Sequence, residues 1–276
     1  MGRKSMRIGL IAGSGQFPIL FCERARQQGF AIYAVAFKDE ADPSLAAHVE
    51  KMIWLHVGQL GRLLKFFKTH QIDATVMMGA IRKTRLFKNL KPDIKALSLI
   101  AGMRHTHDDG ILRVFADYLE KNGIQVRAST FLLPELLAEP GCWTRRKPSR
   151  SEKADIQMGW RLAKEIGRLD IGQCVVVGGG SVLAVEAVDG TDATIRRGGE
   201  LGHGNAVVIK VSKPIQDERF DVPAVGVQTV ETMHESNARL LVVEAGKALV
   251  FDKQAMISAA DAAGISIVAM EDPITD

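Results

Sequence analysis

Strand-sized apolar runs alternate with helical patterns through the first half of the chain, and this alternation restricts the fold more than any other feature. The strands expected from it cover residues 8–12, 31–37, 52–57, 74–80 and 124–129, and the helices cover 17–29, 58–71, about 93–104 and 109–122. Strands that alternate with helices of about 12 residues are typical of βαβ units around a parallel sheet. The sequence therefore predicts a Rossmann-like domain over residues 1–135.

The pattern changes in the second half. Segment 139–150 combines two prolines with basic residues and is interpreted as part of a linker over 136–150. A helix then begins near Ser151, with Ser149 or Ser151 as its cap. Beyond Asp170, runs such as CVVVGGGSVLAV, NAVVIKVSK and FDVPAVGVQTV are β-rich, with glycine breaks and no long helical pattern between them. A separate, strand-rich α/β catalytic domain is expected over 151–276.

Composition and charge narrow the classes of protein. Hydrophobic residues make up 46% and charged residues 25% of the 276, which is enough apolar material for packed cores and excludes a disordered chain, a fibrous repeat or a disulfide scaffold. The formal net charge of +4 fits a phosphate-bearing substrate, an anionic membrane surface or nucleic acid. Three isolated cysteines indicate buried thiols in a reducing cytoplasm, and no apolar run approaches the roughly 20 residues of a spanning helix.

A glycine turn follows the first predicted strand. The segment IAGSGQFP places Gly13, Ser14 and Gly15 between a strand and a helix, where backbone N–H groups can face an anion. Pro18 replaces the third glycine of the dinucleotide fingerprint, so NAD binding is disfavoured. A phosphate contact and a plain tight turn both remain open.

A basic stretch occupies residues 82–95 and includes Leu86 and Phe87 among its cations. It reads either as a solvated face or as a surface for an anionic lipid or membrane. Nucleic acid is disfavoured as a partner, because no signature of a nucleic-acid-binding fold accompanies the stretch.

Two histidines and two aspartates gather in the segment HTHDDG. His105, His107, Asp108 and Asp109 do not have a standard zinc spacing. One aspartate can cap the helix that follows, and a metal or ligand contact is the alternative.

Acids and cations stand together in several turn-like segments of the second half. Guanidinium and ammonium groups complement phosphate oxygens, and carboxylates suit Mg²⁺. The candidate phosphate-binding residues are Arg196, Arg197, Lys213 and Arg219, and the candidate metal ligands are Glu186, Asp192 and Asp221. Such a set resembles machinery for phosphoryl transfer, where positioning and charge neutralisation do most of the catalysis.

Three long segments of the second half carry a family resemblance. LDIGQCVVV (169–177), VLAVEAVDGTDATIRR (182–197) and KPIQDERFDVPAVGV (213–227) look like signature segments of the UDP-2,3-diacylglucosamine pyrophosphatases of the lipid A pathway, the type unrelated to calcineurin-like metallophosphatases. IAGSGQFP and DDGILR match as well. The resemblance therefore covers nearly the whole chain in order.

The resemblance implies two domains joined by a linker, with the substrate between them. It implies Mg²⁺-dependent hydrolysis of UDP-2,3-diacylglucosamine to 2,3-diacylglucosamine 1-phosphate and UMP, with water attacking the phosphorus nearer the sugar. The critical aspartate of the family falls on Asp221, which would either ligate the metal or accept a proton from water. The residues expected to contact substrate are Gly13, Ser14, Gly15, Gly79, Gln173, Thr191, Arg196, Arg197, Lys213 and Arg219, and the expected metal ligands are Asp221 and Asp192.

Some positions and partners stay open. Thr194 stands where the family pattern has methionine, and the glycine-rich stretch after Arg197 is short. The acyl chains would need an apolar groove, and its candidate lining residues, each with a core reading as well, are Met77, Met78, Leu86, Phe87, Leu132 and Leu133. A cytoplasmic enzyme in transient contact with the inner membrane is expected, with a homodimer left open. The alternatives are a non-catalytic nucleotide-sugar or lipid-phosphate binding protein and a membrane-surface adaptor.

Overall fold

The computed structural model describes residues 6–81, 91–101, 108–219 and 222–273. The chain divides into two compact units, and the first of them includes a short segment from the second half of the sequence. Unit 1 comprises Met1–Leu133 together with Asp217–Asp221, and unit 2 comprises Pro134–Gln216 together with Val222–Asp276. The chain therefore passes from one unit to the other three times.

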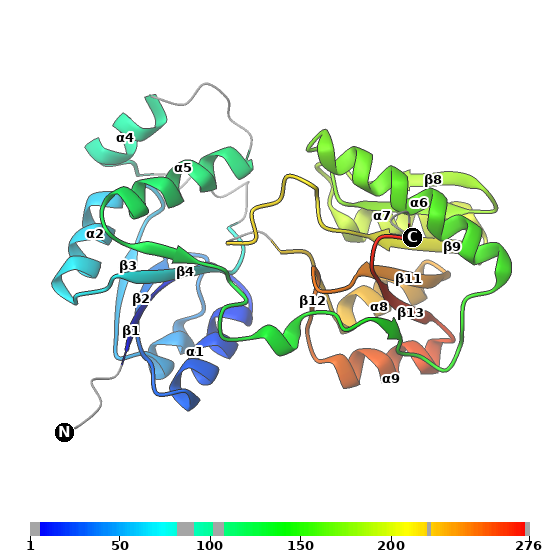
Figure 1. Cartoon of the computed structure of the whole chain (residues 1–276), viewed down its shortest axis with the longest axis horizontal. Coiled ribbons are helices and arrows are strands. Elements are labelled where there is room, and N and C mark those ends of the chain that lie inside the picture. The colour runs from blue at the N-terminus through cyan, green and yellow to red at the C-terminus, as the bar shows by residue number, and fades with distance from the viewer. Residues whose placement is uncertain (1–5, 82–90, 102–107, 220–221, 274–276) are drawn as a thin grey trace. The chain divides into compact units, whose positions relative to one another are not determined.

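Unit 1 is built on a five-stranded parallel sheet in the order β3-β2-β1-β4-β5 (Figure 1). Its strands are β1 (Arg7–Ala12), β2 (Ala31–Phe37), β3 (Lys51–Leu55), β4 (Ala74–Met78) and β5 (Gln125–Arg127). Its helices are α1 (Phe17–Gln27), α2 (Leu60–Thr69), α4 (Ile94–Ala101), α5 (Asp108–Lys121) and the 3-10 turn η1 (Pro43–His48). This strand order confirms the Rossmann-like fold predicted from the alternation.

The sequence of unit 1 explains its layers. The strands are apolar along nearly their whole length, as expected for a parallel sheet covered on both faces. Leu63, Leu64 and Phe67 of α2 are buried against β-strand residues such as Val35 and Met77. The order of the strands reverses between β1 and β4, and the carboxyl ends flanking such a switch point form a favoured ligand-binding position in α/β folds.

Unit 2 contains a mixed six-stranded sheet in the order β6-β13-β11-β9-β7-β8, in which β9, β11 and β13 are parallel. Its strands are β6 (Gly141–Cys142), β7 (Cys174–Gly178), β8 (Ser181–Val185), β9 (Ala206–Lys210), β11 (Ala238–Glu244) and β13 (Ser266–Met270), and β10 (Ala224–Val225) pairs separately with β12 (Leu249–Val250). Its helices are α6 (Arg150–Arg168), α7 (Thr191–Gly202), α8 (Val227–Glu235), α9 (Lys253–Ala263) and the 3-10 turn η2 (Pro134–Leu136). The expected strand-rich α/β architecture is confirmed.

The long helix α6 covers one face of this sheet. Ser149 is its cap: the Ser149 hydroxyl accepts from the Glu152 N–H, and the Glu152 carboxylate accepts from the Ser149 N–H, which completes a capping box. The fully buried Trp160 packs against Val175 and Leu240 on the sheet. The opposite face packs against α7, α8 and α9 around a second core that contains Val176, Leu241 and Met256.

Two helices of unit 2 contradict the expectation of β runs and turns. The segment after Asp189 forms α7, and the end of FDVPAVGVQTV forms the start of α8. Glycines lower the helix propensity of α7, and β-branched residues lower that of both segments. Close packing in the folded protein outweighs these low propensities. A Cβ on Gly198 would lie 2.5 Å from Val176 Cβ, and one on Gly199 would lie 2.3 Å from the Ser236 carbonyl oxygen.

Residues 136–150, expected as a linker, belong to unit 2. Within this segment β6 pairs antiparallel with β13, and the Trp143 N–H donates to the Ile267 carbonyl. The prolines and cations that suggested a linker lie on either side of these sheet contacts. Among the described residues, no helix is both long and apolar enough to cross a membrane.

Candidate functional site

The glycine turn of unit 1 lies directly beside Gly79, at the switch point of the parallel sheet. The Ser14 N–H and hydroxyl both donate to the Ala80 carbonyl, each at 2.8 Å, and the Ala80 N–H donates back to Ser14. A Cβ on Gly13 would lie 2.5 Å from the Ala80 carbonyl oxygen, and one on Gly79 would lie 2.5 Å from the Ser14 carbonyl oxygen. Two backbone segments approach this closely only because both carry glycine.

A buried carboxylate joins two of the predicted site segments in unit 2. Glu186 follows β8 and is 7% exposed. One of its oxygens accepts the Gln173 N–H at 2.9 Å, and the other accepts the Thr191 hydroxyl at 2.9 Å. The structure therefore brings Gln173 and Thr191 together, as members of one hydrogen-bonded group at the N-terminus of α7.

The loop after β9 adds Lys213 and Gln216 to this group. The Lys213 ammonium lies 2.7 Å from the Asp170 carboxylate, in the segment that also contains Gln173. Gln216 Oε1 accepts the Lys213 N–H at 2.8 Å, and Gln216 Nε2 lies 3.5 Å from Gln173 Oε1. We call Asp170, Gln173, Glu186, Thr191, Lys213 and Gln216 the polar cluster.

Three other predicted residues lie on α7. Arg197 is exposed and is held by Asp189 at 2.6 Å and by the Val185 carbonyl at 2.9 Å. Asp192 and Arg196 are exposed, and within the described ranges neither side chain has a hydrogen bond or an ion pair. Both are therefore accessible to a ligand, whereas Arg197 is already committed to neighbours in its own unit.

Lys210 was missed by the sequence reasoning. It ends β9, is 8% exposed, and donates from Nζ to the Ala224 carbonyl at 2.8 Å. Burial raises the pKa of the neighbouring Cys174 thiol, Glu186 and Asp192 raise it further, and Lys210 acts in the opposite direction. These three charged side chains therefore lie near Cys174. The sequence signal that could have identified Lys210 is a lysine that interrupts the apolar run NAVVIKVSK.

Arg219 belongs to a different group, in unit 1. It lies in residues 217–221, which we call the strap. The Arg219 guanidinium binds the Asp217 carboxylate through two nitrogens, at 2.9 and 2.7 Å, and donates to Glu120 of α5 at 3.1 Å. Arg113 of α5 lies 3.8 Å from Asp217. Arg219 thus attaches the strap to α5 within unit 1.

The strap predicts a pH-dependent stability. Hydrogen bonds from Arg219 hold the pKa of Asp217 below its usual value of about 3.9. A lowered folded-state pKa stabilises the protein above pH about 4, and the effect is lost as pH falls through the folded value. We expect Asp217→Asn to lower the free energy of unfolding by about 1–2 kcal/mol at pH 7. Urea unfolding at pH 7 and pH 3 measures this difference, which should shrink at pH 3; a constant difference would contradict the assignment.

Several expected residues fall outside the described ranges or in the core. Asp221, His105, His107, Leu86, Phe87 and residues 82–90 of the basic stretch are outside the described residues. The main chain at Asp108 and Asp109 is already helical, as the start of α5. The remaining residues suggested for an acyl groove are buried, which gives them the core reading: Met77, Met78, Leu132 and Leu133.

A magnesium ion at this site would need few ligands from the protein. Mg²⁺ is usually bound through one or two carboxylates, with waters and substrate phosphates completing the shell. The described part of the chain contains no group of three His, Cys, Asp or Glu side chains able to hold a metal. Asp192 is an accessible carboxylate beside the polar cluster, so the chemistry present fits such a phosphate-completed site.

The parallel sheet with its glycine loops, and the second sheet with its polar cluster, define a two-domain α/β protein. Residues 7–136 match the model of the LpxI N-terminal domain, and residues 139–268 match that of the LpxI C-terminal domain. The chain belongs to the LpxI family, which confirms the resemblance drawn from the sequence.

A curated relative from Caulobacter vibrioides carries the name UDP-2,3-diacylglucosamine pyrophosphatase LpxI. It is 34% identical over 277 residues, which cover 96% of this chain and 98% of the relative. The two proteins therefore correspond along nearly their full lengths.

Two solved structures illustrate a low level of structural similarity. The biotin carboxylase domain of Hydrogenobacter thermophilus 2-oxoglutarate carboxylase matches with 12% identity and a TM-score of 0.28, covering 65% of this chain and 36% of that one. N5-carboxyaminoimidazole synthetase from Staphylococcus aureus matches with 12% identity and a TM-score of 0.26, covering 75% and 48%. The chain spans a third to a half of these proteins, and similarity at this level carries no conclusion.

Proposed function

We propose that this chain hydrolyses the pyrophosphate of UDP-2,3-diacylglucosamine to 2,3-diacylglucosamine 1-phosphate and UMP, as a hydrolase of lipid A biosynthesis. The observation that carries the proposal is the 34% identity to the named pyrophosphatase over 96% of the chain. The polar cluster supports it, since Gln173, Thr191 and Lys213 were singled out from the sequence and lie in one hydrogen-bonded group.

The reaction breaks one bond and forms one. The oxygen of water attacks the phosphorus nearer the sugar, the bond from that phosphorus to the bridging oxygen breaks, and UMP leaves with the bridging oxygen. Lys213, Arg196 and the buried Lys210 are the cations proposed to offset the charge of the pyrophosphate. The Gly13–Gly15 turn and Gly79 are proposed to line the substrate site beside the N-terminus of α1. The Gly13 and Ser14 N–H groups already donate to the Met78 and Ala80 carbonyls, so they are not the proposed donors to the substrate.

Mg²⁺ is the proposed cofactor, with Asp192 and Asp221 as its protein ligands. When bound, the ion would neutralise phosphate charge and make a bound water easier to deprotonate. An aspartate with an ordinary pKa of about 3.9 is a weak base at neutral pH, so the ligand role suits Asp221 better than the role of base.

The test is UMP release from UDP-2,3-diacylglucosamine by the full chain in water enriched in ¹⁸O. We expect release with Mg²⁺, loss of release with excess EDTA, and recovery when Mg²⁺ is restored. The label should enter 2,3-diacylglucosamine 1-phosphate and be absent from UMP. Label in UMP would overturn the proposed point of attack, and release that persists in EDTA would overturn the proposed cofactor.

Other outcomes separate the alternatives. Substrate binding without release would identify a non-catalytic nucleotide-sugar or lipid-phosphate binding protein. Neither binding nor release would overturn the proposed function. We also propose a cytoplasmic location with transient contact at the inner-membrane surface, because the substrate carries two acyl chains; sedimentation with anionic vesicles with and without substrate tests this contact.

A further inference from the structure

An ion pair on the α6 face of the unit 2 sheet binds both the N–H and the carbonyl of Ser212, in the loop after β9. Lys164 Nζ lies 2.6 Å from Glu244 Oε2 and donates to the Ser212 carbonyl at 3.0 Å. The Ser212 N–H donates to the same Glu244 oxygen at 2.9 Å. Lys164 and Glu244 are 17% and 13% exposed at their side chains, so solvent screens this arrangement only in part.

Ser212 transmits this constraint to the polar cluster. Its hydroxyl donates to Gln216 Oε1 at 2.9 Å, the same oxygen that accepts the Lys213 N–H. Gln216 in turn faces Gln173, whose N–H is held by Glu186. A continuous set of hydrogen bonds therefore runs from Lys164 and Glu244 to the residues assigned to substrate.

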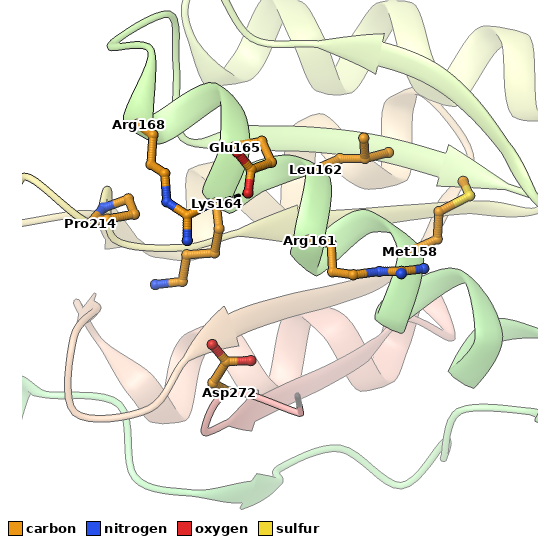
Figure 2. A pocket seen from close by; sticks show the side chains of 8 residues that line it. All are labelled: Met158, Arg161, Leu162, Lys164, Glu165, Arg168, Pro214 and Asp272. Carbon is orange, nitrogen blue, oxygen red and sulfur yellow. Dashed lines mark hydrogen bonds and ion pairs between the residues drawn. The ribbon is translucent and has the colours of Figure 1, made fainter. Parts of the chain in front are cut away.

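The pair lies on the opposite side of the sheet from Glu186 and Lys210. Leu240 and Val242 of β11 belong to the α6-side core, and Glu244 continues their alternation. Ala184 and Val208 belong to the core on the other face, so Glu186 and Lys210, two residues further along the chain, lie on that side. Lys164 therefore acts on the cluster only through the loop backbone. Figure 2 shows Lys164 on α6 near Arg168, on a groove that Pro214 also lines.

We propose that Lys164 and Glu244 are positioning residues for the hydrolysis, and that they act by fixing Ser212 and thereby Gln216. The inference rests on the proposed function. A half-buried ion pair is weak evidence for stability by itself, because desolvation offsets much of its attraction. Control of geometry gives the pair a role that a surface pair lacks, since a small misplacement of catalytic groups costs up to about 100-fold in rate.

The variants are Lys164→Met, Glu244→Gln, their combination, and the conservative Lys164→Arg. Arg168→Met is the matched control, because Arg168 lies one turn along α6 and pairs with the exposed Glu165. We expect Lys164→Met to lower kcat about 10- to 100-fold with a smaller change in KM, Lys164→Arg to recover part of it, and Arg168→Met to leave kcat unchanged. Hydrogen exchange should rise at the amides of residues 211–216 in Lys164→Met and stay unchanged in Arg168→Met.

The double variant separates positioning from folding. It removes the unpaired carboxylate that Lys164→Met leaves behind, so its melting temperature should recover while its kcat stays low. Recovery of kcat together with the melting temperature would overturn the proposal, and so would unchanged exchange at residues 211–216. Hydrogen exchange tests the positioning of the loop even if the parent protein releases no UMP. Absence of UMP release from the parent is the separate result that would show the proposed function to be wrong.

Discussion

Replacing Asp221 by alanine is expected to reduce UMP release by about 10²–10⁴-fold, the usual effect of losing a residue that handles the attacking water or its metal. Described residues that precede and follow Asp221 in the sequence have hydrogen-bonded partners. Arg219 binds Asp217 and Glu120, and the Ala224 carbonyl accepts from the buried Lys210.

Asp221→Asn tests whether the charge or the shape of the side chain matters. Asparagine keeps the shape and loses the carboxylate, so we expect it to be nearly as inactive as alanine. Asp73→Ala is the control, because Asp73 is an exposed residue just before β4 and takes no part in the strap contacts. Circular dichroism and melting temperature establish that the variants are folded. Activity of Asp221→Ala within tenfold of the parent would refute the assignment.

The same variants separate the two roles left open for Asp221. A metal ligand predicts that Asp221→Asn needs more added Mg²⁺ for half-maximal release. A general base predicts an unchanged Mg²⁺ requirement and a kcat that stays low at saturating Mg²⁺. Titration with Mg²⁺ at fixed substrate measures the difference.

Gly79→Ala is expected to destabilise unit 1 by about 3–4 kcal/mol, among the larger effects of a single substitution. The added Cβ would lie 2.5 Å from the Ser14 carbonyl oxygen and 2.8 Å from the Gly13 carbonyl carbon, so backbone would have to move. The φ of Gly79 is +83°, a conformation that costs alanine further energy.

Gly15→Ala is the matched control for Gly79→Ala. Gly15 has φ +97° and lies in the adjacent loop, but a Cβ there would meet nothing within 4 Å. Its expected cost is therefore the conformational part alone, roughly 1–2 kcal/mol. Urea unfolding, with hydrogen exchange of peptides from β1 and β4 to assign the change to unit 1, measures both. Equal losses would show that the close approach of the two loops contributes nothing.

Local sequence patterns predicted unit 1 well. Buried parallel strands are apolar along their length and helices repeat every 3.6 residues, so β1, β2 and α2 can be recognised without long-range information. The capping box of α6 is similarly local, since Ser149 and Glu152 are three residues apart. α7 could not be recognised in this way, because its Gly198 and Gly199 are explained only by contacts with Val176 and Ser236, which lie elsewhere in the sequence. α8 was missed because its β-branched residues favour a strand in a local reading.

The candidate site was likewise predicted from the sequence only in part. The family resemblance singled out Gln173 and Thr191, but the carboxylate that joins them, Glu186, entered only as one of several acids. Lys210 was missed because a buried cation is visible in the sequence only as an interruption of an apolar strand. Sequence also grouped Arg219 with the phosphate-binding cations, whereas its contacts are with α5.

The three passages of the chain between its units bear on how such a protein can be divided or recombined. A gene fragment encoding residues 134–276 would include the strap but lack Arg113 and Glu120, its partners on α5. A fragment encoding residues 1–133 would lack Asp217 and Arg219, which contact those residues in the full chain. The halves matched by the two family models are therefore not independent modules for exchange between genes, because Asp217 and Arg219 lie in the second half and bind α5 of the first.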